Sequence, residues 1–142
     1  LFRSTPLLSI GQNSSGELVF SGNAGFLAVG SYGGNTAPGL YYFDVTSQTP
    51  VAKLLGDKIS AQYICILGPT KGYVSSADFW GAYPSAVYPF NPGEPSQGLG
   101  EAVSGLLPNS FPQDIAVANG RVYVADNAHN VVYRLNDSGN AV

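Results

Sequence analysis

A repeated pattern with a period of about 45 residues constrains the fold of this chain more than any other feature. Each repeat contains an apolar stretch with an Asp or Asn at or next to its end: LYYFDV, AVYPFN and VVYRLN. These ends, at Asp44, Asn91 and Asn136, are 47 and then 45 residues apart. Asp and Asn side chains favour turns, so each stretch reads as a strand followed by a turn.

Two further strands precede each of these stretches, and a fourth follows two of them. Gln62 in QYICIL aligns with Gln113 in QDIAVA, and ELVFSG at 17–22 takes the same place in the first unit. Fourth strands are predicted within 49–56 and 99–107, with a short helix as the alternative for GLGEAVSGLL at 98–107. Four short antiparallel strands in about 45 residues are typical of a β-propeller blade.

The second strands follow Gly-bearing turns and alternate in polarity, as expected for half-buried strands. In this alignment Leu27, Gly72 and Val122 take matching places, as do Val29, Val74 and Val124. The resulting prediction is an all-β chain with strands near 5–10, 17–21, 26–30, 40–45, 50–55, 62–67, 72–76, 86–90, 99–104, 113–118, 121–125 and 131–135. The same alternation predicts a core that contains Leu27, Val29, Tyr42, Ile64, Ile66, Val74, Ile115, Val117, Val122, Val124 and Val132.

The last unit, FPQDIAVANGRVYVADNAHNVVYRLNDSGNAV at 111–142, resembles an NHL repeat. The likeness lies in the Pro-Gln before the first strand, VYVAD in the second, Asn130 at the start of the third and NDSG at the next turn. The other units match in spacing and pattern and have longer loops. The resemblance implies a six-bladed propeller, but it implies no activity, because propellers support many unrelated functions.

The two ends of the chain favour an incomplete ring. TPLLSIG at 5–11 mirrors TPVAKLLG at 49–56, whereas the last unit stops after its third strand. We therefore expect one propeller segment over 1–142, with an outer strand of a neighbouring blade at 1–11 and units at 12–56, 57–108 and 109–142.

Three blades cannot close a ring, since propellers have about 4–8. Another copy or another polypeptide is expected to complete it as the other half of six blades. A strand like 5–11 from that partner is expected to pair with 131–135, which would otherwise be an open edge.

Charge and apolar content narrow the classes of partner. The chain has six basic residues, a net charge of −3 and 11% charged residues. Nucleic-acid binding needs a basic patch, so nucleic acid is not an expected partner. No apolar run approaches the roughly 20 residues of a membrane span. The few charges and the many Gly, Ser, Asn and Tyr residues favour an extracellular or cell-surface protein. Cys65 lies in the apolar YICIL run and is predicted to be a buried, inert thiol.

Candidate ligand-binding residues gather in the loops after the second strands, which share one rim of a propeller. These loops are 31–39, 76–85 and 126–130. Aromatic rings beside amides and carboxylates suit a carbohydrate or peptide ligand. The competing interpretation is that Trp80 and Tyr83 only pack against neighbouring loops. The predicted rim residues are Tyr32, Asn35, Asp78, Trp80, Tyr83, Asp126, Asn127 and His129.

Catalytic and metal-binding patterns are weak in this sequence. His129 is the only histidine, whereas a catalytic zinc site uses three protein ligands. Asp126 and Asn127 offer oxygen ligands to calcium, but such side chains also satisfy loop backbone. No GxSxG, HExxH or P-loop pattern occurs. The sequence thus predicts no cofactor, with calcium as the exception to test.

The predicted function is that of a non-enzymatic extracellular propeller module for protein or carbohydrate binding or for assembly. The alternative is a metal-dependent propeller enzyme of the lyase or lactonase type, with its site completed by the other half of the ring.

Overall fold

The computed structural model describes residues 15–31 and 37–142, and these residues form three antiparallel sheets. Sheet A contains β1 (Ser15–Ser21), β2 (Ala24–Val29), β3 (Gly39–Asp44) and β4 (Lys53–Gly56). Sheet B contains β5 (Ala61–Gly68), β6 (Lys71–Ser76) and β7 (Ala86–Phe90). Sheet C contains β8 (Pro112–Ala118), β9 (Arg121–Asp126) and β10 (Val131–Arg134).

The predicted all-β class is confirmed for the described part of the chain. Its only helical element is a 3-10 turn, η1 (Pro95–Gln97). No helix in 15–31 or 37–142 has the length and apolar character needed to cross a bilayer. The predicted strand at 5–10 lies outside the described residues.

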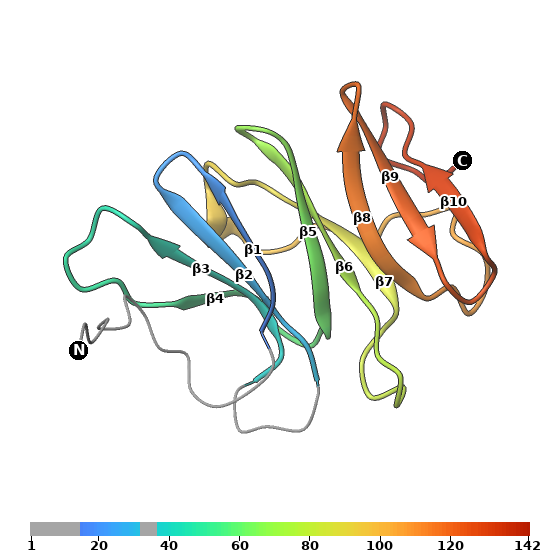
Figure 1. Cartoon of the computed structure of the whole chain (residues 1–142), viewed down its shortest axis with the longest axis horizontal. Helices are drawn as coiled ribbons and strands as arrows, with labels where there is room; N and C mark the ends of the chain where they lie inside the picture. The colour runs from blue at the N-terminus through green and yellow to red at the C-terminus, as the bar shows by residue number, and fades with distance from the viewer. Residues whose placement is uncertain (1–14, 32–36) are drawn as a thin grey trace, which may run out of the picture.

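The sheets stand side by side in chain order, with sheet B between sheets A and C (Figure 1). Within each sheet, every strand is hydrogen-bonded to the next strand along the chain. A first core fills the space between sheets A and B, around Phe26, Leu40 and Val74. A second core lies between sheets B and C, around Tyr73, Val87 and Val124. Sheet B is therefore covered on both faces.

The three sheets repeat the same register, which confirms the predicted spacing of the third strands. Phe43 pairs with Gly25 in sheet A, and Phe90 pairs with Gly72 in sheet B. In sheet C the Leu135 N–H donates to the carbonyl of Val122. Phe43, Phe90 and Leu135 are thus equivalent, and they precede Asp44, Asn91 and Asn136.

The predicted alignment of the second strands was wrong in sheet A by two residues. Leu27 lies opposite Tyr41, just as Val74 lies opposite Tyr88, so Leu27 corresponds to Val74 and not to Gly72. Gly25 takes the place of Gly72 because both lie beneath the ring of a phenylalanine on the third strand.

The predicted core is correct in six places and wrong in two. The side chains of Val29, Ile64, Val74, Ile115, Val122 and Val124 are buried. Val132 is 67% exposed because Tyr133 on β10 and Leu135 just after it point into the core, and alternation places Val132 on the opposite face. Val117, next to the β8–β9 turn, is 39% exposed. Leu27, Tyr42 and Ile66 are partly buried.

The predicted strand at 99–104 is wrong, although this segment does lie beside β7. Leu99 forms an isolated bridge with Phe90, and the N–H groups of Gly100 and Val103 donate to the carbonyls of Pro89 and Val87. The Pro89 carbonyl faces this segment. In a strand the N–H and the carbonyl of one residue point to the same side, so any other residue at position 89 would donate its N–H to this segment. A regular ladder cannot form there, because Pro89 has no hydrogen to donate.

The outer edge of β10 is paired at its end by residues of the same chain. After a turn at 136–140, Ala141 bridges Leu135. Val142 and Arg134 exchange backbone hydrogen bonds of 2.9 and 3.1 Å. The expectation that this end of β10 is an open edge is therefore wrong. Whether a strand like 5–11 pairs with the remainder stays a prediction, since 5–11 lies outside the described residues.

Candidate functional site

Loops at one end of the three sheets contact one another and hold most of the predicted site residues. The Ser31 hydroxyl, after β2, donates to Asp78 in the loop after β6 at 2.9 Å. In that loop the Phe79 ring meets the Phe111 ring edge to face at 5.8 Å. The Phe111 N–H in turn donates to Asp126 at the end of β9 at 2.8 Å. Tyr32 and Asn35 lie outside the described residues.

Asp78 holds the 77–85 loop in shape. Its carboxylate is buried and accepts hydrogen bonds from the N–H groups of Trp80 at 3.1 Å and Tyr83 at 2.9 Å, besides the one from Ser31. Burial raises the pKa of Asp78, but these hydrogen bonds outweigh burial and hold the pKa below its ordinary value. The carboxylate is therefore an internal brace of the loop.

Buried hydroxyl groups fix the base of the same loop. Ser60 N–H donates to the Ser76 hydroxyl at 3.1 Å, which donates to the Pro84 carbonyl at 2.6 Å. The Gln62 amide donates to the Ser60 hydroxyl at 3.1 Å and to the Ala77 carbonyl at 3.0 Å. Sequence reasoning missed this network, because single serines in strands carry no signal of mutual contact.

Two adjacent aromatic side chains project from the braced loop into solvent. Phe79 is 83% exposed and Trp80 is 70% exposed, and we call this pair the aromatic ridge. Tyr83 is partly buried. Sequence reasoning selected Trp80 and missed Phe79, although the FW dipeptide in a turn-rich loop was the available signal.

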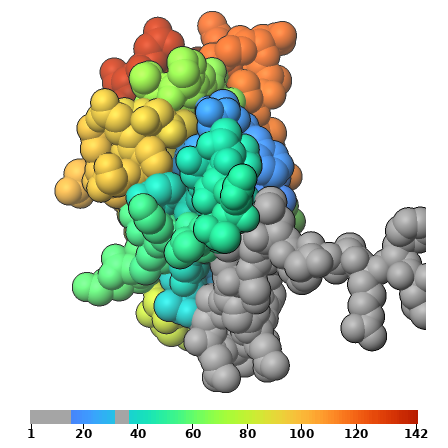
Figure 2. Space-filling view, turned by 90° about the vertical axis from the view of Figure 1, so that its left-hand side faces the viewer, coloured from blue at the N-terminus to red at the C-terminus, as the bar shows by residue number. Residues whose placement is uncertain are grey.

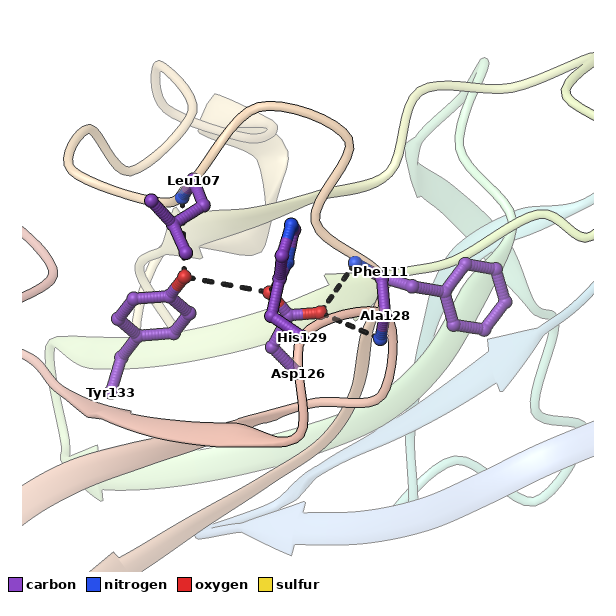
Figure 3. A network of polar contacts seen from close by, with 6 residues as sticks. All are labelled: Leu107, Phe111, Asp126, Ala128, His129 and Tyr133. Carbon is purple, nitrogen blue, oxygen red and sulfur yellow. Dashed lines mark hydrogen bonds and ion pairs between the residues drawn. The ribbon is translucent and has the colours of Figure 1, made fainter.

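Asp126 holds its own 126–130 loop and the start of β8 together through hydrogen bonds to its carboxylate (Figure 3). Its buried carboxylate accepts hydrogen bonds from the N–H groups of Phe111 and Ala128 at 2.8 and 3.0 Å, and His129 Nδ1 lies 2.7 Å from it. The Tyr133 hydroxyl, 3.5 Å from the carboxylate, accepts the N–H of Leu107 at 3.2 Å. Burial raises the pKa of Asp126, but the hydrogen bonds outweigh burial and lower it to about 2.

The position of Asp126 is a repeated structural position. Asp126 pairs with Pro112 as Ser76 pairs with Ala61. Each of the two side chains accepts the N–H of the residue just before the first strand of its sheet: Ser60 for Ser76, and Phe111 for Asp126. The carboxylate of Asp126 thus satisfies loop backbone, which was the competing interpretation of this residue.

The remaining predicted residues of this loop face outward to different degrees. Asn127 is exposed, and the His129 side chain is 30% exposed and oriented by Asp126. Within 15–31 and 37–142, no three His, Cys, Asp or Glu side chains are grouped closely enough to hold a metal ion. Cys65 is buried as predicted, and burial raises its pKa to about 12.

A groove of about 700 Å³ lies at the opposite end of the molecule, between the turns of sheets A and B. Its lining includes Tyr42, Lys53, Pro69, Pro92 and Pro95. In Figure 2 the atoms of the 92–95 segment, in gold, adjoin the teal and green atoms of sheet A. No local sequence pattern indicates this groove, because it forms between segments that are distant along the chain.

Comparison of the chain with family models, curated proteins and solved structures found no match.

Proposed function

We propose that this chain is a non-enzymatic extracellular module of the propeller type, and that it binds a carbohydrate through the aromatic ridge. One observation carries the proposal: Phe79 and Trp80 are adjacent, strongly exposed and held on a loop that is braced from within. Contiguous exposed apolar side chains mark interaction sites, and tryptophan is enriched among the residues that contribute most to binding.

The chemistry of the rim supports a carbohydrate as the ligand. Flat rings cover the apolar faces of a sugar, while nearby polar groups fix its orientation. The exposed Asn127 and the oriented ring of His129 are the polar groups of the neighbouring loop. Because Asp78 and Asp126 are occupied by loop backbone, they act as braces of the site and do not contact the ligand in this proposal.

The repeated register supports the propeller architecture. Three sheets of three or four antiparallel strands follow one another, and equivalent residues face equivalent neighbours. In this architecture the loops after β2, β6 and β9 share one rim, which makes the aromatic ridge part of a larger surface.

The proposal is tested by the fluorescence of Trp80, the only tryptophan of the chain. We expect one or more neutral oligosaccharides in a panel to shift its emission in a saturable way. Phe79→Ala keeps the reporter and should weaken binding by about tenfold, as truncation of an interface anchor does. Phe20→Ala, at an exposed phenylalanine beside the β1–β2 turn, is the matched control and should bind normally.

Two outcomes would contradict the carbohydrate proposal. The first is a panel in which only peptides shift the emission, which would assign the ridge to protein binding. The second is equal affinity of Phe79→Ala and the unchanged chain, which would place the ligand elsewhere.

A further inference from the structure

Each of the three sheets has two different faces, and the two cores show which face of one sheet packs on which face of the next. We call the face toward the following sheet the forward face and the face toward the preceding sheet the backward face. Between sheets A and B, a forward face packs on a backward face, and the same holds between sheets B and C. Among residues 15–31 and 37–142, no other sheet covers the backward face of sheet A or the forward face of sheet C.

The backward faces share one cross-strand pattern: two aliphatic residues on the first and second strands and a tyrosine on the third. In sheets B and C this triplet belongs to the cores. In sheet A it lies on the outside, with Leu18 49% exposed and Leu27 and Tyr41 partly buried. The triplets are Leu18, Leu27 and Tyr41 in sheet A, Ile64, Val74 and Tyr88 in sheet B, and Ile115, Val124 and Tyr133 in sheet C.

The forward faces share a second pattern: an aromatic residue on the second strand and an aliphatic residue on the third. In sheets A and B these residues are buried in the two cores. In sheet C they are on the outside, where Val132 is 67% exposed and Tyr123 partly buried. The pairs are Phe26 and Leu40 in sheet A, Tyr73 and Val87 in sheet B, and Tyr123 and Val132 in sheet C.

One polar contact between sheets A and B has a matching acidic residue in sheet C. Glu17, one residue before Leu18, reaches across to sheet B and accepts the N–H of Ile64 at 2.5 Å. Asp114, one residue before Ile115, pairs with Ala125 on the forward face of sheet C and is exposed. Its carboxylate now accepts the N–H of Ile115 in its own strand at 2.7 Å. Asp114 thus stands on sheet C in the place that Glu17 has on sheet A, and it carries a carboxylate of the same kind.

We propose that the forward face of sheet C binds the backward face of sheet A in a second copy of this chain. The second copy is the occupant because this chain itself carries the complementary face, which no described sheet covers. That face has the residue types that cover forward faces twice in the interior. Asp114 of one copy then accepts the N–H of Leu18 in the other. Since each copy has one face of each kind, two copies satisfy both contacts about a two-fold axis and bring six sheets together.

This inference rests on the propeller architecture of the proposed function, but it does not depend on the ligand. The two are tested by separate readouts, the mass of the particle for the pairing and Trp80 emission for the ligand. Failure of either leaves the other standing.

Sedimentation velocity of the 142-residue chain over a range of concentrations tests the pairing. We expect a species of twice the chain mass, and Val132→Arg should weaken the association by at least about tenfold, because it buries an unpaired charge. Val51→Arg is the matched control: Val51 is also 67% exposed but lies in the β3–β4 connection, away from both faces. Thermal melting of each variant shows that the fold is retained.

Mixing two variants separates head-to-tail pairing from pairing of like faces. Val132→Arg and Leu18→Glu each disrupt one face, so each alone should be monomeric. Mixed in equal amounts, they retain one unchanged contact and place Arg opposite the Glu-bearing face in the other, and association should return.

A chain that is monomeric at every concentration would overturn the proposal and indicate another occupant. Association that Val132→Arg does not weaken, or a mixture that stays monomeric, would overturn it as well.

Discussion

At the scale of the residue, sheets A and B share one contact, in which a phenylalanine ring on the third strand packs directly on a glycine of the second strand. A Cβ at Gly72 would lie 2.6 Å from the tip of the Phe90 ring, and a Cβ at Gly25 would collide with Phe43 in the same way. At the equivalent position of sheet C, the second strand has Val122 in place of the glycine, and Leu135 takes the place of the larger phenylalanine. The glycine and the ring are therefore one unit, which can be exchanged only together.

We expect Gly72→Ala to lower the free energy of unfolding by about 1–3 kcal/mol, because the ring of Phe90 must move within a packed core. Adding Phe90→Leu should recover part of this loss, since it reproduces the arrangement of sheet C. Urea unfolding measures both effects. Gly68→Ala is the control, because a Cβ there meets nothing within 4 Å, and it should change stability little. A Gly72→Ala protein as stable as the unchanged chain would contradict this prediction, because it would show that the Phe90 ring can move at no cost in stability.

At the scale of the element, β8 shows how one strand divides between buried and exposed positions on the same face. Ile115 and Val117 both point toward sheet B, as their pairing with Val124 and Val122 requires. Ile115 is 4% exposed, whereas Val117, near the turn, is 39% exposed. Alternation therefore predicts which face a side chain lies on, but it does not predict how deeply that side chain is buried.

Truncation of these two residues should have unequal effects. Ile115→Ala should cost about 2–5 kcal/mol of unfolding free energy, the range for a large aliphatic residue in a core. Val117→Ala should cost clearly less, because its side chain keeps much of its contact with water. Thermal or urea unfolding of the two variants compares them directly, and equal losses would refute the assignment of Val117 to the periphery.

Some elements of the fold could be predicted from the sequence and others could not. Apolar alternation and regular turn residues located the strands of the three sheets, because these signals are local. The prediction of a strand at 99–104 was wrong because Pro89 interrupts the ladder there. Pro89 lies on the neighbouring strand, about ten residues earlier in the sequence. The prediction for Val132 was wrong because Val131 and Val132 are both apolar and leave the direction of the strand open at this point. The charged Arg134 was the local signal that places Val132 on the face opposite Tyr133 and Leu135. Within the site, Trp80 was identified by type, but the bracing of its loop by Asp78 is a tertiary property.

At the scale of the whole molecule, the three sheets differ in cover although they share one pattern. In the part of the chain that the structure describes, sheet B packs on both faces, whereas sheets A and C each pack on one other sheet. In repeated structures, stability is roughly the sum of each unit and its neighbour contacts. The middle sheet therefore has one more stabilising neighbour than either end sheet.

Amide hydrogen exchange of the monomeric chain should show this difference. Leu27, Val74 and Val124 occupy equivalent places in β2, β6 and β9, so their own strand geometry is matched. We expect the N–H of Val74 to exchange most slowly, because opening sheet B disrupts both cores. Faster exchange at Val74 than at the other two would show that the sheets do not unfold as stacked units.

The proline that interrupts the edge of sheet B also has a consequence for behaviour at high concentration. Extended segments of other molecules add to a sheet by forming a continuous ladder along an exposed strand. Pro89 leaves β7 with a missing donor midway, and the 99–103 segment already occupies the carbonyls of Val87 and Pro89. β7 is thereby a poor template for fibril growth, and sheet B is protected from strand capture without a fourth regular strand.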